Sequence, residues 1–183
     1  MAHTLYHPLL VAGATVATSL TGCQLSLSYV SVPAILSISD ISEYATLSMW
    51  RVTFNKGFHL CPTQAFLSSL IFFLNAFLTF LYGDASSPDS KSVYPLLIAG
   101  FLAISLIPFT LAMIVPLEEA LIKRHGTLSR EGSNAFGKGN ISKEHGAVAA
   151  TRTRDLMKQW TSLNYTRTVL PLATVIWVWA MCL

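Results

Sequence analysis

The sequence predicts an all-α integral membrane protein, a four-helix bundle with an interfacial helix between its first and second spans. Hydrophobic residues make up 52% of the 183 residues and charged residues only 11%, whereas a soluble domain carries about 25% charged residues. Four apolar stretches are long enough to cross a hydrocarbon core of about 30 Å. They cover residues 9–36, 63–82, 93–115 and 161–182. We therefore expect a single membrane domain over residues 1–183.

The first apolar stretch could be interpreted as a cleaved signal sequence instead of a membrane span. Leu20-Thr-Gly-Cys23 is similar to the cleavage box of a bacterial lipoprotein, which would make the segment a cleaved signal sequence. However, no Lys or Arg precedes the apolar run, and hydrophobic residues continue beyond Cys23 to Leu36. We therefore interpret the segment as a retained span.

An interfacial helix is predicted between the first two spans, over residues 41–58. Trp50, Phe54 and Phe58 recur at i, i+4 and i+8, as on one apolar face of a helix lying in the membrane surface. Gly57 is expected to end this helix before the second span begins. Asn75, near the centre of that span, is expected to make an interhelical hydrogen bond.

The third span ends at Pro116 and is followed directly by two glutamates. Glu118 or Glu119 is a plausible partner for Arg167 or Arg51, although both could simply face cytosolic water. Residues 125–150 are rich in Gly, Ser and Lys, a composition typical of a flexible loop.

The distribution of basic residues predicts the orientation. Loops 37–62 and 116–160 lie on the same side of the membrane and contain ten of the twelve Lys and Arg residues. The positive-inside rule places these loops in the cytosol and both termini in the lumen or outside. We expect a multi-pass protein of the endoplasmic reticulum or another endomembrane, in contact with membrane lipid. No nucleic-acid partner is expected, because acids interrupt the basic residues.

Arg167 is a charge within the fourth span. A helix rises 1.5 Å per residue, which places Arg167 roughly 10 Å inward of Trp160. Charges at membrane depth usually face a bundle interior or a water-filled cavity. Asn164 and Trp160 lie three and seven residues earlier, on the same helical face. This pattern predicts a polar pocket just below the membrane surface; the alternative is an arginine that snorkels to the headgroups.

The residues around this pocket suggest a chemistry. Aromatic walls with guanidinium groups suit a planar, apolar molecule that develops phenolate or enolate charge, and a histidine can move a proton near neutral pH. The alternative is that these residues are ordinary interfacial anchors with a bystander histidine. Cys23, Cys61 and Cys182 are far apart in sequence and in predicted depth and form no C-x-x-C pair, which excludes a quinone-linked or vitamin-K-type thiol oxidoreductase. The candidate site residues are Trp50, Arg51, His59, Trp160, Asn164 and Arg167.

Four motifs along the chain carry a family resemblance. They are Val32-Pro33-Ala34, Trp50-x3-Phe54-x2-Gly57 leading to Pro62, Pro108-x-Thr110 followed by Pro116-Leu117-x3-Leu121, and Trp160-x3-Asn164-x2-Arg167-x3-Pro171-Leu172. With these motifs the chain resembles the anthrone oxygenases, small four-helix membrane proteins of fungal aromatic polyketide pathways. One departure is that Glu118-Glu119 stands where an asparagine is expected soon after Pro116.

The resemblance implies a monooxygenase that converts a planar polyketide anthrone to an anthraquinone with molecular oxygen as co-substrate. It further implies that no flavin, haem or metal is needed, and that other pathway enzymes are possible contacts. His59 would then be the base. Arg167 and Arg51 would stabilise the anion and the peroxide, and Trp50, Trp160 and Asn164 would orient the rings.

Three alternatives remain open at this stage. A two-His-one-carboxylate metal site would have to come from His59, His125, His145 and Glu118, but their spacing does not support it. A non-enzymatic scaffold would gather pathway enzymes at the membrane through the glycine-rich loop. A transporter is disfavoured, because spans one and two do not resemble spans three and four.

Overall fold

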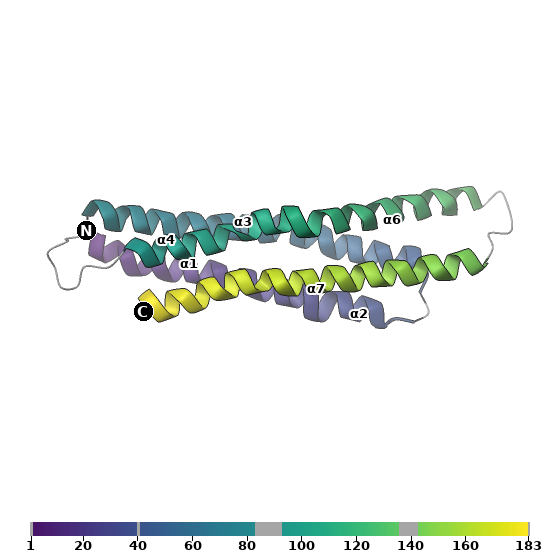
Figure 1. Cartoon of the computed structure of the whole chain (residues 1–183), viewed down its shortest axis with the longest axis horizontal. Helices are drawn as coiled ribbons and strands as arrows, with labels where there is room; N and C mark the ends of the chain where they lie inside the picture. The colour runs from purple at the N-terminus through teal and green to yellow at the C-terminus, as the bar shows by residue number, and fades with distance from the viewer. Residues whose placement is uncertain (1, 40, 83–92, 136–142, 183) are drawn as a thin grey trace.

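The computed structural model describes residues 2–39, 41–82, 93–135 and 143–182. Within these ranges the secondary structure is helical and contains no strand. Figure 1 shows long helical rods side by side in an elongated bundle. The predicted all-α four-helix fold is therefore confirmed. The rods are built from α1 (Ala2–Leu25), η1 (Ser26–Ser31) and α2 (Val32–Ser37); α3 (Glu43–Tyr82); α4 (Val93–Ile104), α5 (Leu106–Phe109), η2 (Thr110–Ile114) and α6 (Val115–Ala135); and α7 (Lys143–Cys182).

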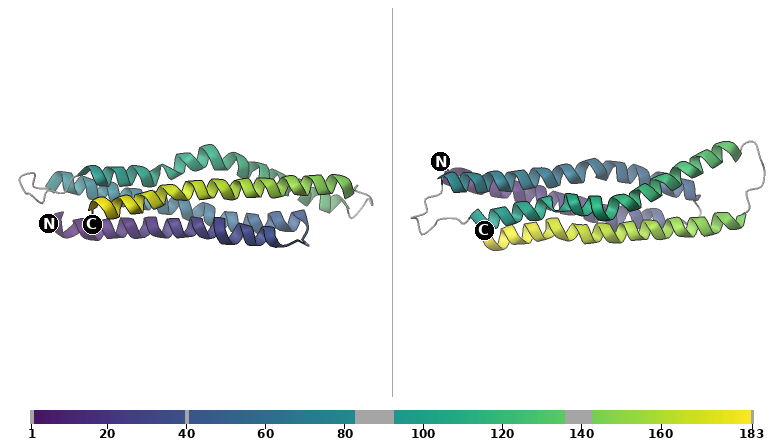
Figure 2. Two further views of the ribbon diagram at one scale, coloured as in Figure 1. Left: turned by 60° about the horizontal axis from the view of Figure 1, so that its bottom comes forward. Right: turned by 45° about the horizontal axis from the view of Figure 1, so that its top comes forward.

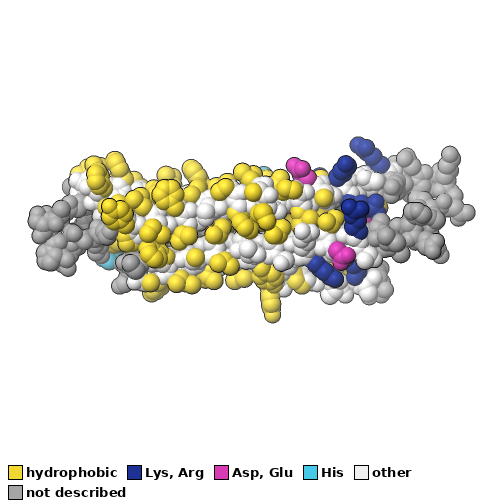
Figure 3. All heavy atoms as spheres, viewed as in Figure 1, with side chains coloured by type: hydrophobic (Ala, Val, Ile, Leu, Met, Phe, Trp, Pro, Cys, Tyr) yellow, Lys and Arg dark blue, Asp and Glu magenta, His cyan; other side chains and the backbone are white. Residues whose placement is uncertain are grey.

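The two ends of the bundle differ in character. Both termini lie at one end, and α6 and α7 approach their connection at the other (Figure 1). Hydrophobic side chains cover most of the length, whereas Lys and Arg gather toward the α6–α7 end (Figure 3). The 40 residues of α3 span about 60 Å, twice the thickness of a hydrocarbon core. A membrane that surrounds the apolar length would therefore leave the charged end outside its hydrocarbon core; which side that end faces stays a prediction.

Three described helical stretches are long and apolar enough to cross a membrane. They are Leu5–Ser37, Glu43–Tyr82 and Val93–Arg130, and they contain the first three predicted spans. The fourth predicted span, residues 161–182, lies in α7, which is not among the three. It therefore remains a prediction.

The predicted interfacial helix is not a separate element. Its residues are helical from Glu43, but α3 continues without interruption into the second span, through both Gly57 and Pro62. Trp50 is fully buried and Phe54 nearly so, so this apolar face packs into the bundle instead of lying on a membrane surface. A neighbouring rod contacts α3 at Gly57, which explains why the glycine is accommodated inside the helix.

Helices also occupy most of the segment predicted to be a flexible loop. α6 reaches Ala135 and α7 begins at Lys143, so that part of the 125–150 prediction is corrected, and residues 136–142 lie outside the described ranges. Arg124 donates two hydrogen bonds to Glu43, at 2.8 and 2.9 Å, and Thr153 donates a third. These bonds connect α6 and α7 to the start of α3. Such tertiary contacts override a weak local helix preference.

Small residues allow the rods to pack closely at the other end. A Cβ placed on Gly13 would lie 2.8 Å from the ring of Phe72, so only glycine fits there without a shift. Ser68 donates a hydrogen bond of 3.1 Å to the carbonyl of Gly13, and Asn75 donates one of 3.0 Å to the carbonyl of Tyr6. The interhelical hydrogen bond predicted for Asn75 is therefore confirmed.

Candidate active site

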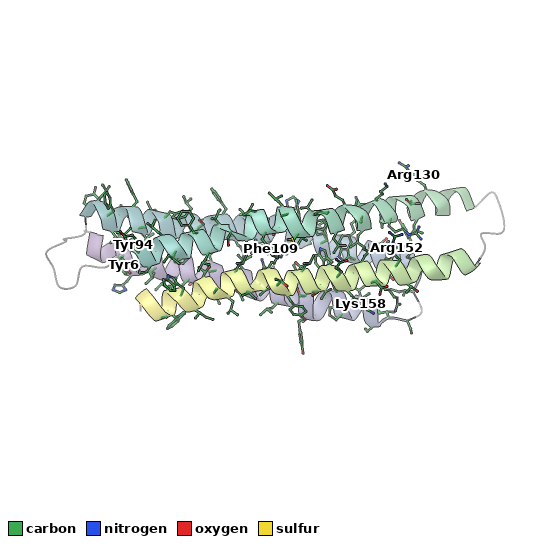
Figure 4. All side chains as sticks on the ribbon, viewed as in Figure 1. Tyr6, Tyr94, Phe109, Arg130, Arg152 and Lys158 are labelled. Carbon is green, nitrogen blue, oxygen red and sulfur yellow. The ribbon has the colours of Figure 1, made fainter. Side chains whose placement is uncertain are left out.

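Two π-helical segments lie near mid-length of the bundle. Proline lacks an N–H and its ring disturbs the preceding turn of a helix. Pro33 lies two residues after the end of η1, and Pro108 and Pro116 flank η2. Both views in Figure 2 show the rod from α4 to α6 bending at this level. Figure 4 marks the same level with Phe109, between Tyr6 and Tyr94 toward one end and three labelled basic residues toward the other. Single π turns in helices often occur at functional sites.

A small pocket lies between the rods at this level. Its volume is about 10 Å³, room for roughly one water molecule. Each π-helical segment contributes one wall residue, Leu27 from η1 and Thr110 from η2. The pocket is lined by Leu27, Phe54, Gly57, Phe58, Pro62, Thr110, Glu118, Trp160 and Arg167.

Arg167 is the cation of this pocket, and its side chain is 6% exposed. A guanidinium has five N–H donors. Within the described part of the chain, its one hydrogen bond runs from Nη1 to Thr110 Oγ1 at 3.5 Å, and Nε has no partner. Buried polar groups are nearly always hydrogen-bonded. The guanidinium therefore retains donors for an acceptor that enters the pocket, and it does not snorkel to the surface.

Glu118 is the carboxylate of the same pocket. It is 4% exposed and accepts a hydrogen bond of 3.1 Å from Trp160 Nε1. The salt bridge found among the described residues joins Arg124 to Glu43 instead, although Glu118 and Arg167 are close enough to interact electrostatically. Glu118 therefore faces the pocket and not cytosolic water, whereas Glu119 is exposed. The Glu118 carboxyl group and the Arg167 guanidinium therefore line the same pocket without forming a salt bridge with each other.

The aromatic residues Phe54, Phe58 and Trp160 line the pocket, and Trp50 packs behind them. Trp50 stacks on Phe54 with ring centroids 5.2 Å apart, and it meets Trp160 edge to face at 5.8 Å. Asn164 is fully buried and donates a hydrogen bond of 2.9 Å to the carbonyl of Trp160. The side-chain oxygen of Asn164 and the indole nitrogen of Trp50 have no partner among the residues described. The site thus combines flat apolar surfaces with unpaired donors and acceptors.

The chain matches the anthrone oxygenase family over residues 50–177. The protein belongs to the anthrone oxygenase family. It is 27% identical over 153 residues to the anthrone oxygenase AgnL2 of Paecilomyces divaricatus. The aligned region covers 84% of this chain and 82% of that protein. No solved structure matches the chain. The matched range contains every pocket residue except Leu27.

Of the six site residues predicted for this anthrone oxygenase family member, Trp160 and Arg167 line the pocket. Trp50 and Asn164 lie behind this wall, where Trp50 contacts the ring of Trp160 and Asn164 is hydrogen-bonded to its carbonyl. The other two, Arg51 and His59, are exposed on α3 and do not line the pocket.

Those two side chains have neighbours elsewhere. Arg51 Nη1 lies 3.2 Å from Nδ1 of His125, whose ring stacks on Tyr44 with centroids 5.0 Å apart. The ring of His59 meets Phe58 edge to face. Catalytic roles for Arg51 and His59 therefore stay predictions that this arrangement does not support.

Sequence reasoning missed several residues of the pocket. Thr110 belongs to the Pro108-x-Thr110 motif, and its place in that motif was the only sequence feature that could have indicated it as a pocket residue. Leu27 and Gly57 meet only because η1 packs on α3, which no local pattern reveals. The two thiols of Cys23 and Cys61, expected to be far apart, lie 3.8 Å from each other.

The predicted alternative of a metal site receives no support from the described side chains. In that set, no three His, Cys, Asp or Glu residues come close enough to hold a metal ion. His125 lies beside Ser48 and Arg51, and His59 is on the exposed face of α3. The side chain of His145 lies outside the described set.

Proposed function

We propose that this protein oxidises a polyketide anthrone to the corresponding anthraquinone with molecular oxygen, in secondary metabolism. Family membership supports an oxygenase of this type, and the relative from Paecilomyces divaricatus carries the same activity in its name. The observation that carries the proposal is the buried guanidinium of Arg167, nearly free of hydrogen bonds, between aromatic walls and beside a carboxylate.

The first step is removal of a proton from the methylene carbon of the anthrone. The resulting anthrolate is aromatic and carries its negative charge largely on oxygen. Arg167 would hold this oxygen with charge-assisted hydrogen bonds in a water-poor pocket, where such bonds are strongest. Glu118 lines the same pocket and would accept the proton. His59, the base expected from the sequence, faces away from the pocket.

Oxygen then reacts with the bound anion. The anthrolate passes one electron to oxygen, and the resulting radical and superoxide combine into a carbon-bound peroxide, which takes up the proton. The hydroperoxide loses water by giving up its remaining carbon-bound hydrogen, and the carbon becomes the second quinone carbonyl. Overall, one anthrone and one oxygen molecule give one anthraquinone and one water. Arg167 would stabilise both the anthrolate and the peroxide anion.

Substrate entry requires the pocket to open. A volume of about 10 Å³ is far below the roughly 300 Å³ of ordinary ligand pockets. Leu27 lies against Gly57, where a Cβ would approach its Cδ1 to 2.7 Å, and Phe58 is 46% exposed. We infer that these two apolar side chains move aside, and that a planar substrate enters from the lipid between η1 and α3.

Cofactor independence is part of the proposal. An anthrolate can reduce oxygen directly, so the protein has only to bind, deprotonate and shield it. Metal analysis and an absorption spectrum of active, chelator-treated protein test this directly. Activity that is lost to the chelator and restored by iron or copper would contradict it.

The membrane setting completes the proposal. The chain would cross the endoplasmic reticulum or another endomembrane with its charged end in the cytosol, near other enzymes of the pathway. Protease added to intact microsomes should then cut within residues 130–143 without detergent. Protection of this segment until detergent is added would show that the orientation is the reverse of the predicted one.

Purified protein in detergent, supplied with an emodin-type anthrone and oxygen, tests the reaction. Anthraquinone should form faster than in a protein-free blank, with one oxygen molecule consumed per product and one labelled atom incorporated from ¹⁸O₂. A rate equal to the blank would favour a scaffold for other pathway enzymes.

A further inference from the structure

Two thiols lie side by side between α1 and α3, and the reaction above does not use them. The sulfurs of Cys23 and Cys61 are 3.8 Å apart and form no disulfide. Cys61 is 1% exposed and Cys23 is half-buried, with Leu20, Leu106 and Leu170 around them.

The position of this pair relates it to the pocket. Cys23 precedes Leu27 by four residues, and Cys61 follows Gly57 by four, so each cysteine lies one helical turn from the contact between Leu27 and Gly57. That contact covers the pocket where we place substrate entry. We call the contact between Leu27 and Gly57 the entry seam. A covalent bond between the two sulfurs would therefore join the rod that contains η1 to α3, directly beside this seam.

We propose that Cys23 and Cys61 are a reversible thiol oxidation site, in which a hydroperoxide converts the pair to a disulfide that holds the entry seam closed. The sulfurs have to approach by about 1.8 Å to reach the roughly 2.05 Å of an S–S bond. The effect on substrate entry and the identity of the oxidant as the reaction's own hydroperoxide both rest on the proposed function; the pairing of the thiols does not.

The oxidation balances with a hydroperoxide alone. The thiolate of one cysteine attacks the outer peroxide oxygen, which breaks the O–O bond and yields a sulfenic acid and an alcohol. The second sulfur then attacks the sulfenic sulfur, the S–S bond forms, and water leaves. The two sulfurs supply the two electrons that reduce the peroxide, and a small dithiol reverses the change.

The experiment uses the full-length Cys182→Ser variant in detergent, which leaves this pair as the only thiols. Cumene hydroperoxide is the oxidant, and maleimide labelling after denaturation with intact-mass analysis is the readout. We expect both thiols to disappear together with the loss of two hydrogen atoms per chain, and to return on reduction. Two thiols that remain labelled, or oxidation to sulfinic acid at either one, would overturn the pairing.

Cys23→Ser in the same background is the matched control. It cannot form an internal disulfide, so oxidant should leave its anthrone turnover unchanged, whereas turnover of the parent should fall several-fold and recover on reduction. A parent that forms the disulfide without losing turnover would refute the closed seam. If no form turns over the anthrone, the proposed function fails while the thiol result still decides the pairing.

Discussion

The indole N–H of Trp160 donates a hydrogen bond to Glu118 at 3.1 Å, and this bond joins α7 to α6 inside the pocket. It gives a buried carboxylate a neutral partner, whereas Arg167 is hydrogen-bonded to Thr110. A carboxylate that paired directly with the guanidinium would occupy the donors that the proposed anion needs. The bond therefore keeps a base and an anion-binding group side by side and both usable.

Glu118→Gln tests the base. A glutamine side chain retains an oxygen that can accept from Trp160, so the fold should be preserved, but it cannot accept the substrate's proton. We expect anthrone turnover to fall by about 100-fold, in the range attributed to general bases. Steady-state rates of the purified variant, compared with those of exposed Glu119→Gln, measure it. Normal turnover in Glu118→Gln would remove this residue from the mechanism and return His59 to consideration.

Gly57→Ala tests the contact that covers the pocket. The added Cβ would lie 2.7 Å from Cδ1 of Leu27, so the leucine must shift. Overpacking typically destabilises a protein by about 1–3 kcal/mol, and we expect the lower part of this range because the atom that shifts is the end of a flexible side chain. Removing the opposing side chain in Leu27→Ala should relieve the clash, so the double variant should be more stable than the sum of the single changes predicts. Thermal unfolding of all four proteins measures the coupling, and strict additivity would mean that the two residues do not meet.

Acidification tests the network at the charged end, beyond the predicted spans. Burial acts to raise the pKa of Glu43, but hydrogen bonds from Arg124 and Thr153 and the charge of Arg124 outweigh it, so this pKa lies below the ordinary 4.5. A lowered folded-state pKa contributes stability above the unfolded-state pKa, and that stability is lost as the pH falls through the folded value.

The measurement is the thermal midpoint between pH 7 and pH 3, with Arg124→Gln beside exposed Arg130→Gln. Arg124→Gln should lower the midpoint at neutral pH and lose less stability on acidification than the parent. Arg130→Gln should follow the parent at every pH. Parallel curves for Arg124→Gln and the parent would show that Glu43 contributes nothing to the pH dependence.

Composition and helical periodicity were sufficient to predict the fold class. A depleted charge content and long apolar stretches indicated membrane helices, and three of these stretches lie in helices long and apolar enough to cross a membrane. The buried face of α7 followed from the spacing of Trp160, Asn164 and Arg167 by four and three residues. These features depend on a single helix and its environment. They do not require knowledge of which helix lies opposite.

The positions at which the helices begin and end could not be predicted, because contacts between the rods determine them. Gly57 was expected to end a helix, but η1 packs on it and α3 continues through it. The glycine-rich segment was expected to be a loop, but Arg124 and Thr153 anchor the flanking helices to Glu43. Local propensity is weaker than such tertiary contacts.

Only some residues of the candidate site could be predicted, because contacts between the rods also determine which side chains meet there. Trp50 lies seven residues from Gly57 on the inner face of α3, whereas Arg51 and His59 lie on its outer face. Sequence reasoning grouped them by depth alone, since a residue's direction around a helix has meaning only when the neighbouring rods are known. The burial of Glu118 and the meeting of Cys23 with Cys61 depend on packing in the same way.

The most direct test of the account is the anthrone turnover of Arg167→Lys beside that of Arg51→Lys, at equal protein level in detergent. Lysine keeps the charge but loses the planar fork that binds an oxyanion through two hydrogen bonds. We expect Arg167→Lys to lose about 100-fold or more in turnover, as when a preorganised anion contact is removed. Arg51→Lys, exposed and paired with His125, should remain near the parent. Equal and undiminished rates in both variants would contradict the claim that Arg167 holds the substrate anion.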